Sequence, residues 1–422
     1  MRPLSVKRHT PEPPPARVSR RAVLAGAAGA LAAAATPRAQ TPGARPEVPD
    51  DPTKVQGRLA SPLGDRSPFE HPERTSFNRA RTSSQTPLQD LEGIITPSDL
   101  HFERHHAGIP AIDPERYSLL IHGMVERPTI FTLADLQRFP RRSSLNFLEC
   151  SGNGSRAYRP DVFSPDATPQ RIDGLTSTSE WIGVPLKTLF DEVGVLPGAT
   201  WFLAEGSDAA VLTRSIPVSK ALDDALIAYG QNGEALRPAQ GYPARLFLPG
   251  FEGSSNVKWI RRIELADQPF MTREETSKYT DPLPDGTSRM FSLVIDAKSI
   301  ITAPTYPTRI AGPGWWVISG IAWSGRGRIS QVEVTTDGGR SWGRADLAEP
   351  VLPICHTRFR LPWLWDGTEA VLMSRATDET GYVQPTRAEL TAVRGPTTSY
   401  HFNNIRAWKV AADGSVTAHL AD

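Results

Sequence analysis

Proline and glycine interrupt this chain so often that few long helices are expected. The 422 residues include 39 prolines and 33 glycines, and both residue types end helices and favour turns. Such a composition is typical of short strands joined by loops. Because a chain of this length is also long enough for two domains, the sequence predicts a two-domain protein that is not all-helical.

Charge and hydropathy argue against two kinds of partner. Basic and acidic residues are nearly balanced and give a net charge of +1, so nothing in the composition favours binding to nucleic acid. No segment approaches the ~20 apolar residues that a membrane-spanning helix needs. We therefore expect no nucleic-acid partner and no membrane span.

The N-terminus has the pattern of an export signal. Residues 19–24 are Ser-Arg-Arg-Ala-Val-Leu, an alanine-rich stretch covers residues 22–35, and a small-residue cleavage region precedes Gln40. This pattern is typical of a twin-arginine signal peptide; a disordered basic arm is the alternative. We expect residues 1–40 to be removed and the mature protein to be periplasmic. Since this route carries folded proteins, it favours a cofactor inserted before export.

The mature chain begins with a segment that differs in composition from the rest of the protein. Residues 41–96 are rich in Pro, Arg, Ser and Asp and show little periodicity. This composition predicts an extended arm that wraps the surface rather than a domain.

The next region, residues 97–286, mixes helix and strand patterns. Thr132 is a candidate N-cap and Pro140 a stop for one short helix. The pattern predicts helices over residues 132–139 and 185–194, and strands over residues 117–122, 210–213 and 245–248. Such a mixture predicts an α+β domain.

From residue 287 to residue 422 the pattern changes to short strands separated by turns. Residues 329–336 alternate in hydropathy and run into Asp337, Gly338 and Gly339, which is a hairpin signal. Several tryptophans lie nearby in the sequence. The region therefore predicts an immunoglobulin-like β-sandwich, which by itself says nothing about chemistry.

Cys150 is the residue that points most directly to chemistry. Residues 146–156 are Asn-Phe-Leu-Glu-Cys-Ser-Gly-Asn-Gly-Ser-Arg, a buried strand end followed by turn formers that let the backbone approach a ligand. The thiol could be a small buried apolar group, or it could pair with Cys355, the other cysteine. A glycine-rich turn also leaves a thiolate free to act as a nucleophile or as a soft metal ligand.

Several motifs in series carry a resemblance to a known family. They are the Cys150 turn and residues 102–106 (Phe-Glu-Arg-His-His), 241–250, 256–259 (Asn-Val-Lys-Trp) and 336–342 (Thr-Asp-Gly-Gly-Arg-Ser-Trp). Their order and spacing resemble the sulfite oxidase family of molybdenum–pterin oxidoreductases over nearly the whole mature chain. Details at residues 104–110, 274–281 and 381–385 look most like the molybdoprotein subunit of sulfane dehydrogenase in bacterial thiosulfate (Sox) oxidation.

The resemblance implies a cofactor and the residues that hold it. In this family a single cysteine ligates molybdenum beside a pterin dithiolene, and the matching residue is Cys150. The pterin phosphate needs cationic partners, and the cofactor-binding positions fall on His106, Asp208, Arg245 and Lys258. Arg245 stands inside an apolar run, where a buried guanidinium needs an anion. Without the resemblance, Arg245 and Lys258 could be surface residues and His106 an ordinary core or surface histidine.

The resemblance also implies an anion-binding substrate pocket. Its positions fall on Arg104, Trp181, Tyr279 and Arg394, although either aromatic residue could instead belong to the core. One departure concerns the arginine that sulfite oxidases carry five residues after the metal-ligating cysteine, because this chain has Ser155 there and Arg156 one residue later. Loss of that guanidinium fits sulfur presented on a carrier protein, unless Arg156 turns inward.

The implied activity is molybdenum-dependent oxidation of a reduced sulfur compound, either sulfane sulfur on a carrier protein or sulfite. The chain has no C-x-x-C-H haem motif and no cysteine set for an iron–sulfur cluster, so a c-type cytochrome subunit is the expected electron acceptor. The C-terminal sandwich resembles the family's dimerisation domain, which implies a homodimer within a heterotetramer.

Other functions remain open at this point. The closest alternative is a stand-alone periplasmic sulfite dehydrogenase. A metal-free protein that only binds the carrier is a non-enzymatic alternative. A cysteine hydrolase could pair Cys150 with His105 or His106, but it would explain neither the export signal nor the C-terminal domain.

Overall fold

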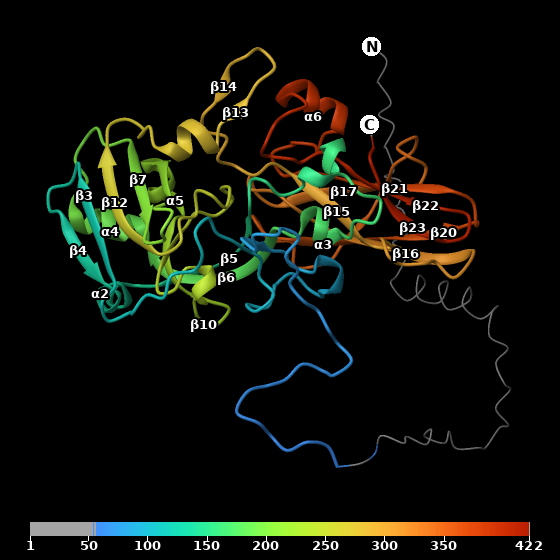
Figure 1. Ribbon diagram of the computed structural model, residues 1–422, viewed down its shortest axis with the longest axis horizontal. Helices are drawn as coiled ribbons and strands as arrows, with labels where there is room; N and C mark the ends of the chain where they lie inside the picture. Colours follow the sequence, from blue (N-terminus) through green and yellow to red (C-terminus); the bar gives the residue numbers. More distant parts are fainter. Residues whose placement is uncertain (1–53, 55, 422) are drawn as a thin grey trace, which may run out of the picture. The chain divides into compact units, whose positions relative to one another are not determined.

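The computed structural model describes residues 54 and 56–421. The predicted signal peptide, residues 1–40, lies outside the described residues. Among the helices that are described, none is both long and apolar enough to cross a membrane. The region from residue 67 onward forms one compact unit that contains all the named helices and strands (Figure 1).

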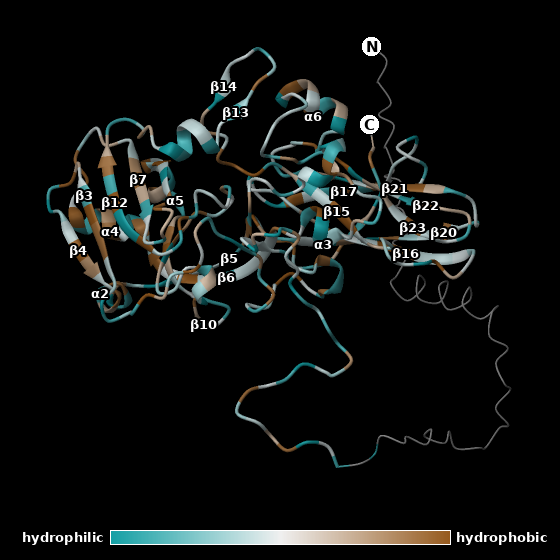
Figure 2. Cartoon of the chain, in the orientation of Figure 1, coloured by the Kyte–Doolittle hydropathy of each residue, from teal (hydrophilic) through white to brown (hydrophobic). Residues whose placement is uncertain are grey.

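One sheet of the α+β region has the strand order β4-β3-β12-β7-β8. Its strands are β3 (Ser118–Gly123), β4 (Thr129–Thr132), β7 (Trp201–Gly206), β8 (Thr213–Pro217) and β12 (Ile260–Ala266). β12 runs parallel to β3, whereas the other neighbours are antiparallel. Apolar residues gather along β3 and β12 (Figure 2), where Leu119, Ile121 and Ile263 are fully buried.

A second sheet of this region carries the segment that leads to Cys150. It has the order β10-β9-β6-β5, and β11 also pairs with β9. Its strands are β5 (Arg142–Glu149), β6 (Thr176–Pro185), β9 (Leu226–Gln231), β10 (Glu234–Ala235) and β11 (Arg245–Phe247). β5 pairs with β6 along its whole length, up to Glu149 opposite Thr176. The strand therefore fixes the backbone up to the residue before Cys150, as the sequence predicts.

The helices are short, in agreement with the composition. They are α2 (Leu133–Arg138), α3 (Pro169–Asp173), α4 (Leu186–Val193), α5 (Val218–Asp223) and α6 (Arg387–Arg394). Single helical turns are η1 (Leu88–Asp90), η2 (Ser155–Ala157), η3 (Pro160–Val162), η4 (Pro238–Gln240) and η5 (Glu274–Lys278). The helices predicted over residues 132–139 and 185–194 are confirmed. Thr132 closes a capping box with Asp135, and Gly194 ends α4 with a φ of 69°.

The strand predicted over residues 210–213 is wrong for most of its length, because only Thr213 belongs to β8. The Val211 N–H donates to the Asp208 carbonyl, and the Leu212 N–H donates to the Asp208 side chain. These bonds hold the segment in a turn, since an aspartate offers the backbone a local alternative to a strand ladder.

The C-terminal region is an immunoglobulin-like β-sandwich, as expected. One sheet has the order β15-β16-β20-β19, and the other has the order β18-β17-β21-β22-β23. The strands are β15 (Lys298–Ala303), β16 (Gly314–Trp323), β17 (Ile329–Thr335), β18 (Gly343–Arg344), β19 (Asp346–Leu347), β20 (Thr357–Trp365), β21 (Ala370–Asp378), β22 (Arg406–Val410) and β23 (Val416–His419). Trp323 and Trp408 are fully buried between the sheets.

The predicted hairpin after β17 is confirmed. Gly338 and Gly339 adopt φ values of 73° and 93°, a conformation that glycine accepts without strain. The Asp337 side chain accepts hydrogen bonds from the Ser341 N–H and O–H, and the chain returns to pair β18 with β17.

Part of the predicted N-terminal arm is buried rather than on the surface. β1 (Ser83–Ser84) pairs with β2 (Glu103–Arg104), and Thr86 and Leu88 are almost completely buried. The Thr86 hydroxyl lies 2.6 Å from the Ser177 hydroxyl on β6. A short hairpin, β13 (Asp281–Pro282) with β14 (Ser288–Arg289), lies in the chain between the α+β region and the sandwich.

Leu189→Ala tests the packing of α4 on the core. Leu189 is fully buried, so the truncation should lower the free energy of unfolding by about 2–5 kcal/mol. The measurement is urea unfolding followed by circular dichroism. The matched control is Lys187→Ala on the exposed face, which removes only a surface ion pair with Asp191 and should change the value by less than about 1 kcal/mol. Equal effects of the two substitutions would contradict the packing described.

Candidate functional site

The Cys150 turn is fixed by backbone hydrogen bonds on both sides. The Cys150 N–H donates to the Leu175 carbonyl over 3.0 Å, and the Asn153 N–H donates to the Cys150 carbonyl over 2.9 Å. Both cysteines of the chain are free thiols, so the pairing with Cys355 does not occur. Burial raises the pKa of the Cys150 thiol, while the nearby Arg104 guanidinium and the Gly152 N–H act in the opposite direction.

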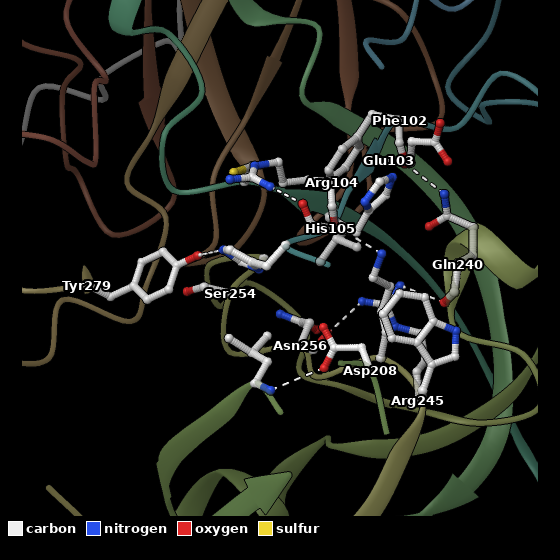
Figure 3. Close-up of a pocket in the computed structure, with 17 residues that line it drawn as sticks. Phe102, Glu103, Arg104, His105, Asp208, Gln240, Arg245, Ser254, Asn256 and Tyr279 are labelled. Carbon is white, nitrogen blue, oxygen red and sulfur yellow. Dashed lines mark hydrogen bonds between the residues drawn. The ribbon is translucent and has the colours of Figure 1, made fainter. Parts of the chain in front are cut away.

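The thiol faces a pocket of about 60 Å³, which we call the Cys150 pocket (Figure 3). Segments far apart in the sequence converge there: the segment after β2, the Cys150 turn, the turn after β7, and the chain around β11. The lining residues are Phe102, Glu103, Arg104, His105, His106, Leu148, Cys150, Asp208, Leu212, Gln240, Arg245, Gly253, Ser254, Asn256, Lys258, Trp259 and Tyr279.

Arg245 is a buried cation without a carboxylate partner among the described residues. It is 1% exposed, and its guanidinium donates to the carbonyls of Gln240 at 3.1 Å and Asn256 at 2.9 Å. Burial lowers its pKa to about 9. A buried guanidinium is costly unless an anion compensates it, so the pocket supplies a positive charge that protein carboxylates do not neutralise.

Lys258 repeats this arrangement next to Arg245. Its ammonium donates to the carbonyls of Arg104 at 3.0 Å and Ala239 at 2.9 Å, and it lies 4.4 Å from the centre of the Trp259 ring. Burial, and then the charge of Arg245, lower its pKa to about 7. Within the described chain no carboxylate pairs with it. The two cations together favour a bound anion such as a phosphate.

The pocket also carries polar groups besides these two cations. The Tyr279 hydroxyl and the His106 Nε2 lie 3.1 Å apart. His105 has a buried Nδ1 that meets no hydrogen-bond partner in the described structure. Asp208 is buried and accepts from the Leu212 N–H. A polar ligand in the pocket can form hydrogen bonds with these groups, and the His105 Nδ1 has no other partner among the described residues.

Trp181 and Arg394 are the predicted site residues that the structure does not bring to the pocket. Trp181 is fully buried beneath it, where its ring stacks on Phe247 at 4.6 Å and lies 5.0 Å from the Arg245 guanidinium. Arg394 is held away by carboxylates, with 3.0 Å to Asp281 and 3.8 Å to Asp296. The other predicted residues, Arg104, His106, Cys150, Asp208, Arg245, Lys258 and Tyr279, all line it.

Arg156 does not replace the arginine that is missing at Ser155. Neither residue lines the Cys150 pocket; both line a separate cavity. Arg156 donates to the Val162 carbonyl at 3.4 Å. The pocket lining contains two arginines. Arg245 donates its hydrogen bonds to backbone carbonyls, whereas the charge of Arg104 lowers the pKa of the Cys150 thiol.

Sequence reasoning missed a buried ion cluster beside the pocket. Arg214 is fully buried and contacts Glu252 at 3.0 Å and Glu275 at 2.9 Å. Its guanidinium lies 4.8 Å from the centre of the Tyr279 ring, and His401 contacts Glu252 at 3.2 Å. The residues of the cluster, Arg214, Glu252, Glu275 and His401, are far apart in the sequence, so no local pattern could have revealed it. The cluster contacts Tyr279 through Arg214.

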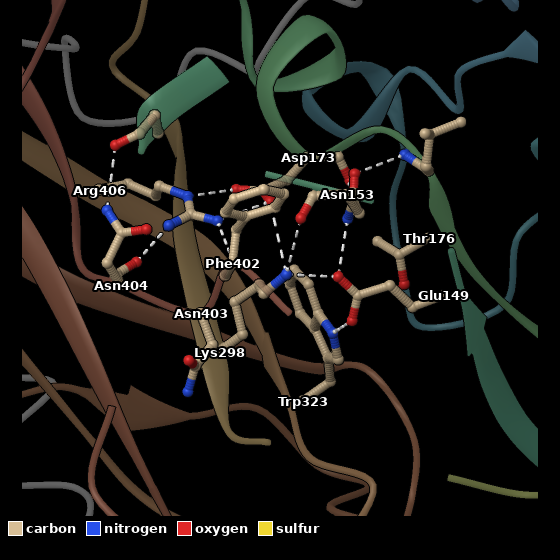
Figure 4. Close-up of polar contacts among 12 residues, drawn as sticks. Glu149, Asn153, Asp173, Thr176, Lys298, Trp323, Phe402, Asn403, Asn404 and Arg406 are labelled. Carbon is tan, nitrogen blue, oxygen red and sulfur yellow. Dashed lines mark hydrogen bonds and ion pairs between the residues drawn. The ribbon is translucent and has the colours of Figure 1, made fainter. Parts of the chain in front are cut away.

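A second buried network anchors the Cys150 turn from behind (Figure 4). Glu149 accepts hydrogen bonds from the Trp323 indole at 2.6 Å and the Asn153 amide at 2.9 Å, and it pairs with Lys298. Lys298 on β15 and Trp323 on β16 belong to the sandwich. The residues on either side of Cys150 are therefore tied to the C-terminal domain.

The network continues from Lys298 to a second buried ion pair. Lys298 lies 3.9 Å from Asp173, and Asp173 accepts from the Arg406 guanidinium at 2.7 and 3.0 Å. All three side chains are almost completely buried. Breaking one member would leave an unpaired buried charge, which is strongly destabilising.

Comparison with known proteins identifies the family of the chain. Residues 106–274 match the model of the oxidoreductase molybdopterin binding domain, and residues 289–407 match the Mo-co oxidoreductase dimerisation domain. Sulfite oxidase of Gallus gallus is 30% identical over 348 residues, covering 75% of this chain and 74% of that protein. The chain belongs to the sulfite oxidase family of molybdopterin oxidoreductases.

Two further proteins extend the comparison. The sulfane dehydrogenase SoxCD from Paracoccus pantotrophus has a solved structure that is 43% identical, with a TM-score of 0.81, and the match covers 88% of this chain and 99% of that one. Nitrate reductase [NADH] 2 of Phaseolus vulgaris is 32% identical over 316 residues, which is 67% of this chain but only 35% of that protein. The chain thus spans about a third of this nitrate reductase.

The residues present fit the molybdenum–molybdopterin cofactor of the sulfite oxidase family. Cys150 offers one soft thiolate. Arg245 offers a buried positive charge and Lys258 a half-buried one, and neither has a carboxylate partner among the described residues. His105 offers a buried nitrogen without a partner there. A phosphorylated pterin would satisfy these groups.

Lys258→Met tests this fit. The substitution keeps the apolar stem and removes the ammonium, so retention of the phosphorylated pterin should fall several-fold because a charge-assisted contact is lost. Molybdenum analysis and pterin fluorescence of the purified protein measure the content. Lys278→Met, at an exposed neighbour of Tyr279, is the control and should retain the cofactor. Unchanged content in Lys258→Met would remove Lys258 from the cofactor site.

The ion cluster around Glu252 predicts a dependence of stability on pH. Burial alone would raise the pKa of Glu252, but Arg214 and His401 more than offset it and lower the pKa to about 2. Because the folded pKa lies below the ordinary value of 4.5, the cluster stabilises the fold above about pH 4.5 and loses this effect as the pH falls towards 2. Wild type should lose thermal stability over this interval more steeply than Glu252→Gln. The exposed Glu115→Gln should follow wild type, and identical profiles for all three proteins would disprove the effect.

Proposed function

We propose that the chain is the molybdenum subunit of a periplasmic sulfur dehydrogenase, in which it oxidises sulfane sulfur presented on a carrier protein. The observation that carries this proposal is the 43% identity to the sulfane dehydrogenase SoxCD over 99% of the matched chain. The dimerisation domain supports a homodimer, and the proposal places this homodimer within a heterotetramer. The twin-arginine pattern supports export, although it lies outside the described residues.

Within this proposal the predicted site residues that line the Cys150 pocket each have a role. Cys150 ligates molybdenum, and Arg245, Lys258, His106 and Asp208 hold the pterin and its phosphate. When bound, the cofactor supplies the two-electron redox chemistry. The protein supplies the position and the charge.

Arg104 and Tyr279 are proposed to face the sulfur donor. Arg104 acts on the Cys150 thiol electrostatically, and a fixed guanidinium there would bind an anionic sulfur group and stabilise negative charge as it develops. The Tyr279 hydroxyl, held by His106 and by the Arg214 cluster, can donate a hydrogen bond to the same group. These residues orient the donor.

The departure at Ser155 favours a carrier-bound donor over free sulfite. Free sulfite is a small dianion and profits from each guanidinium that contacts it. This pocket lacks an arginine at Ser155, and Arg156 lines another cavity. A sulfur atom on a carrier needs fewer charged contacts, because the carrier surface contributes to binding.

Electrons are proposed to leave through a c-type cytochrome subunit. The sequence contains no haem attachment motif and no cysteine set for an iron–sulfur cluster. A separate protein is the natural acceptor for such a chain.

Cys150→Ser tests the central role. A serine keeps the size of the side chain but removes the soft ligand, so we expect oxidation of sulfur donors to fall by more than about 100-fold, beyond the effect of losing an outer-sphere partner. Activity with an artificial acceptor and molybdenum content are measured together. Cys355→Ser, the control at the other cysteine, should stay active. Full activity and full molybdenum in Cys150→Ser would refute the ligand assignment.

Turnover with different donors separates the proposal from its alternatives. We expect faster reduction of cytochrome c with carrier-bound sulfane sulfur than with sulfite. The opposite order would favour a stand-alone sulfite dehydrogenase, which the similarity to sulfite oxidase of Gallus gallus makes the second candidate. Folded, natively exported protein without molybdenum would instead favour a carrier-binding protein that is not an enzyme.

A further inference from the structure

A second cavity is lined by the residues that follow Cys150 in the chain. It has a volume of about 180 Å³, more than about ten times the space that a single water needs. Three segments form it: the glycine-rich turn after Cys150, α3 with the residues that come after it, and the N-terminal segment around β1. The lining residues are Phe77, Asn78, Ser83, Gln85, Gly152, Asn153, Gly154, Ser155, Arg156, Arg171, Ile172, Gly174 and Leu175.

Two arginines supply the charge of this cavity. Arg156 and Arg171 are half-buried, and the lining contains no acidic residue. In the described part of the chain neither arginine has an ion pair, and the hydrogen bond of Arg156 to Val162 is a long one of 3.4 Å. Burial, and then the charge of Arg171, lower the pKa of Arg156, so the two cations act on each other with no protein anion between them.

An unsatisfied donor points to a ligand at the same place. The Nε of Arg171 is buried and meets no partner in the described structure. The Arg171 guanidinium lies 5.5 Å from the centre of the Phe77 ring, which orients it without satisfying its N–H groups. Buried donors of this kind are normally paired.

Bound water alone would not compensate the positive charge of this cavity. Waters can satisfy the N–H groups, but they leave two like charges on one cavity without a compensating negative charge. An anion of charge −2 satisfies the donors and neutralises both guanidinium groups. Arginine forks match the oxygen spacing of planar and tetrahedral oxyanions.

We propose that Arg156 and Arg171 bind a small tetrahedral oxyanion, namely sulfate, at a site separate from the Cys150 pocket. The choice of a sulfur oxyanion rests on the proposed function, whereas the cationic site does not. Cys150 and this cavity share one turn: Gly152 lines the cavity, and its N–H faces the Cys150 thiol. The site therefore places an oxidised sulfur anion on the outer side of the turn that carries the thiol.

The test is isothermal titration of the purified holoenzyme with sodium sulfate at low ionic strength. Arg171→Gln and Arg156→Gln should each weaken binding by about tenfold or more, the effect of one charge-assisted hydrogen bond. Arg159→Gln is the matched control, because Arg159 lies close by in the same segment but pairs with Asp161, and it should bind as wild type does. Circular dichroism checks that each variant is folded.

Two further measurements locate the site and separate it from the Cys150 pocket. Crystals soaked in selenate should show anomalous density between Arg156 and Arg171. Sulfate binding should persist in Arg104→Gln, whose substitution affects the Cys150 pocket, and in Cys150→Ser, which tests the proposed function independently. Loss of all sulfate binding in Arg104→Gln, or unchanged binding in both Arg156→Gln and Arg171→Gln, would overturn the proposal whatever the enzyme oxidises.

Discussion

The ion pair between Glu149 and Lys298 is the interaction on which the rest of the site depends. Glu149 is the last residue of β5 and Lys298 the first of β15, so the pair joins the α+β region to the sandwich at the residue before Cys150. Trp323 and Asn153 donate further hydrogen bonds to the Glu149 carboxylate. Since both charges are buried, the pair is stable only while every partner is in place. This requirement gives the thiol a fixed position that a loop alone would not.

In the Cys150 pocket, unlike in the network around Glu149, cations have no carboxylate partner in the part of the chain that the structure describes. Behind the turn, carboxylates and cations match, whereas in the Cys150 pocket Arg245 and Lys258 meet only carbonyls among the described residues. Matched charges hold the backbone, and unmatched cations are available to a ligand. The contrast explains how one chain can be rigid at Cys150 and still attract an anionic cofactor beside it.

Patterns among neighbouring residues were enough to predict several helices and strands and one residue of the proposed cofactor site. The end of β5, the capping box of α2 and the glycine end of α4 could all be identified from neighbouring residues, and so could Arg245, whose charge interrupts an apolar run. Trp181 and Arg394 could not be placed, because Phe247, Asp281 and Asp296, which hold them, are distant in the sequence. The Arg214 cluster was invisible for the same reason: only the fold brings its carboxylates together.

The residues that line the Cys150 pocket all come from positions 102–279, yet Lys298, Trp323 and Arg406, which hold its central turn, come from the sandwich. The residues that line the pocket and the residues that hold its central turn therefore come from different domains of the chain. The α+β region expressed alone would carry Glu149 and Asp173 without the cations that pair with them. An evolutionary exchange of the C-terminal domain between relatives would therefore have to preserve a lysine, a tryptophan and an arginine at these places, whatever else it altered on the surface.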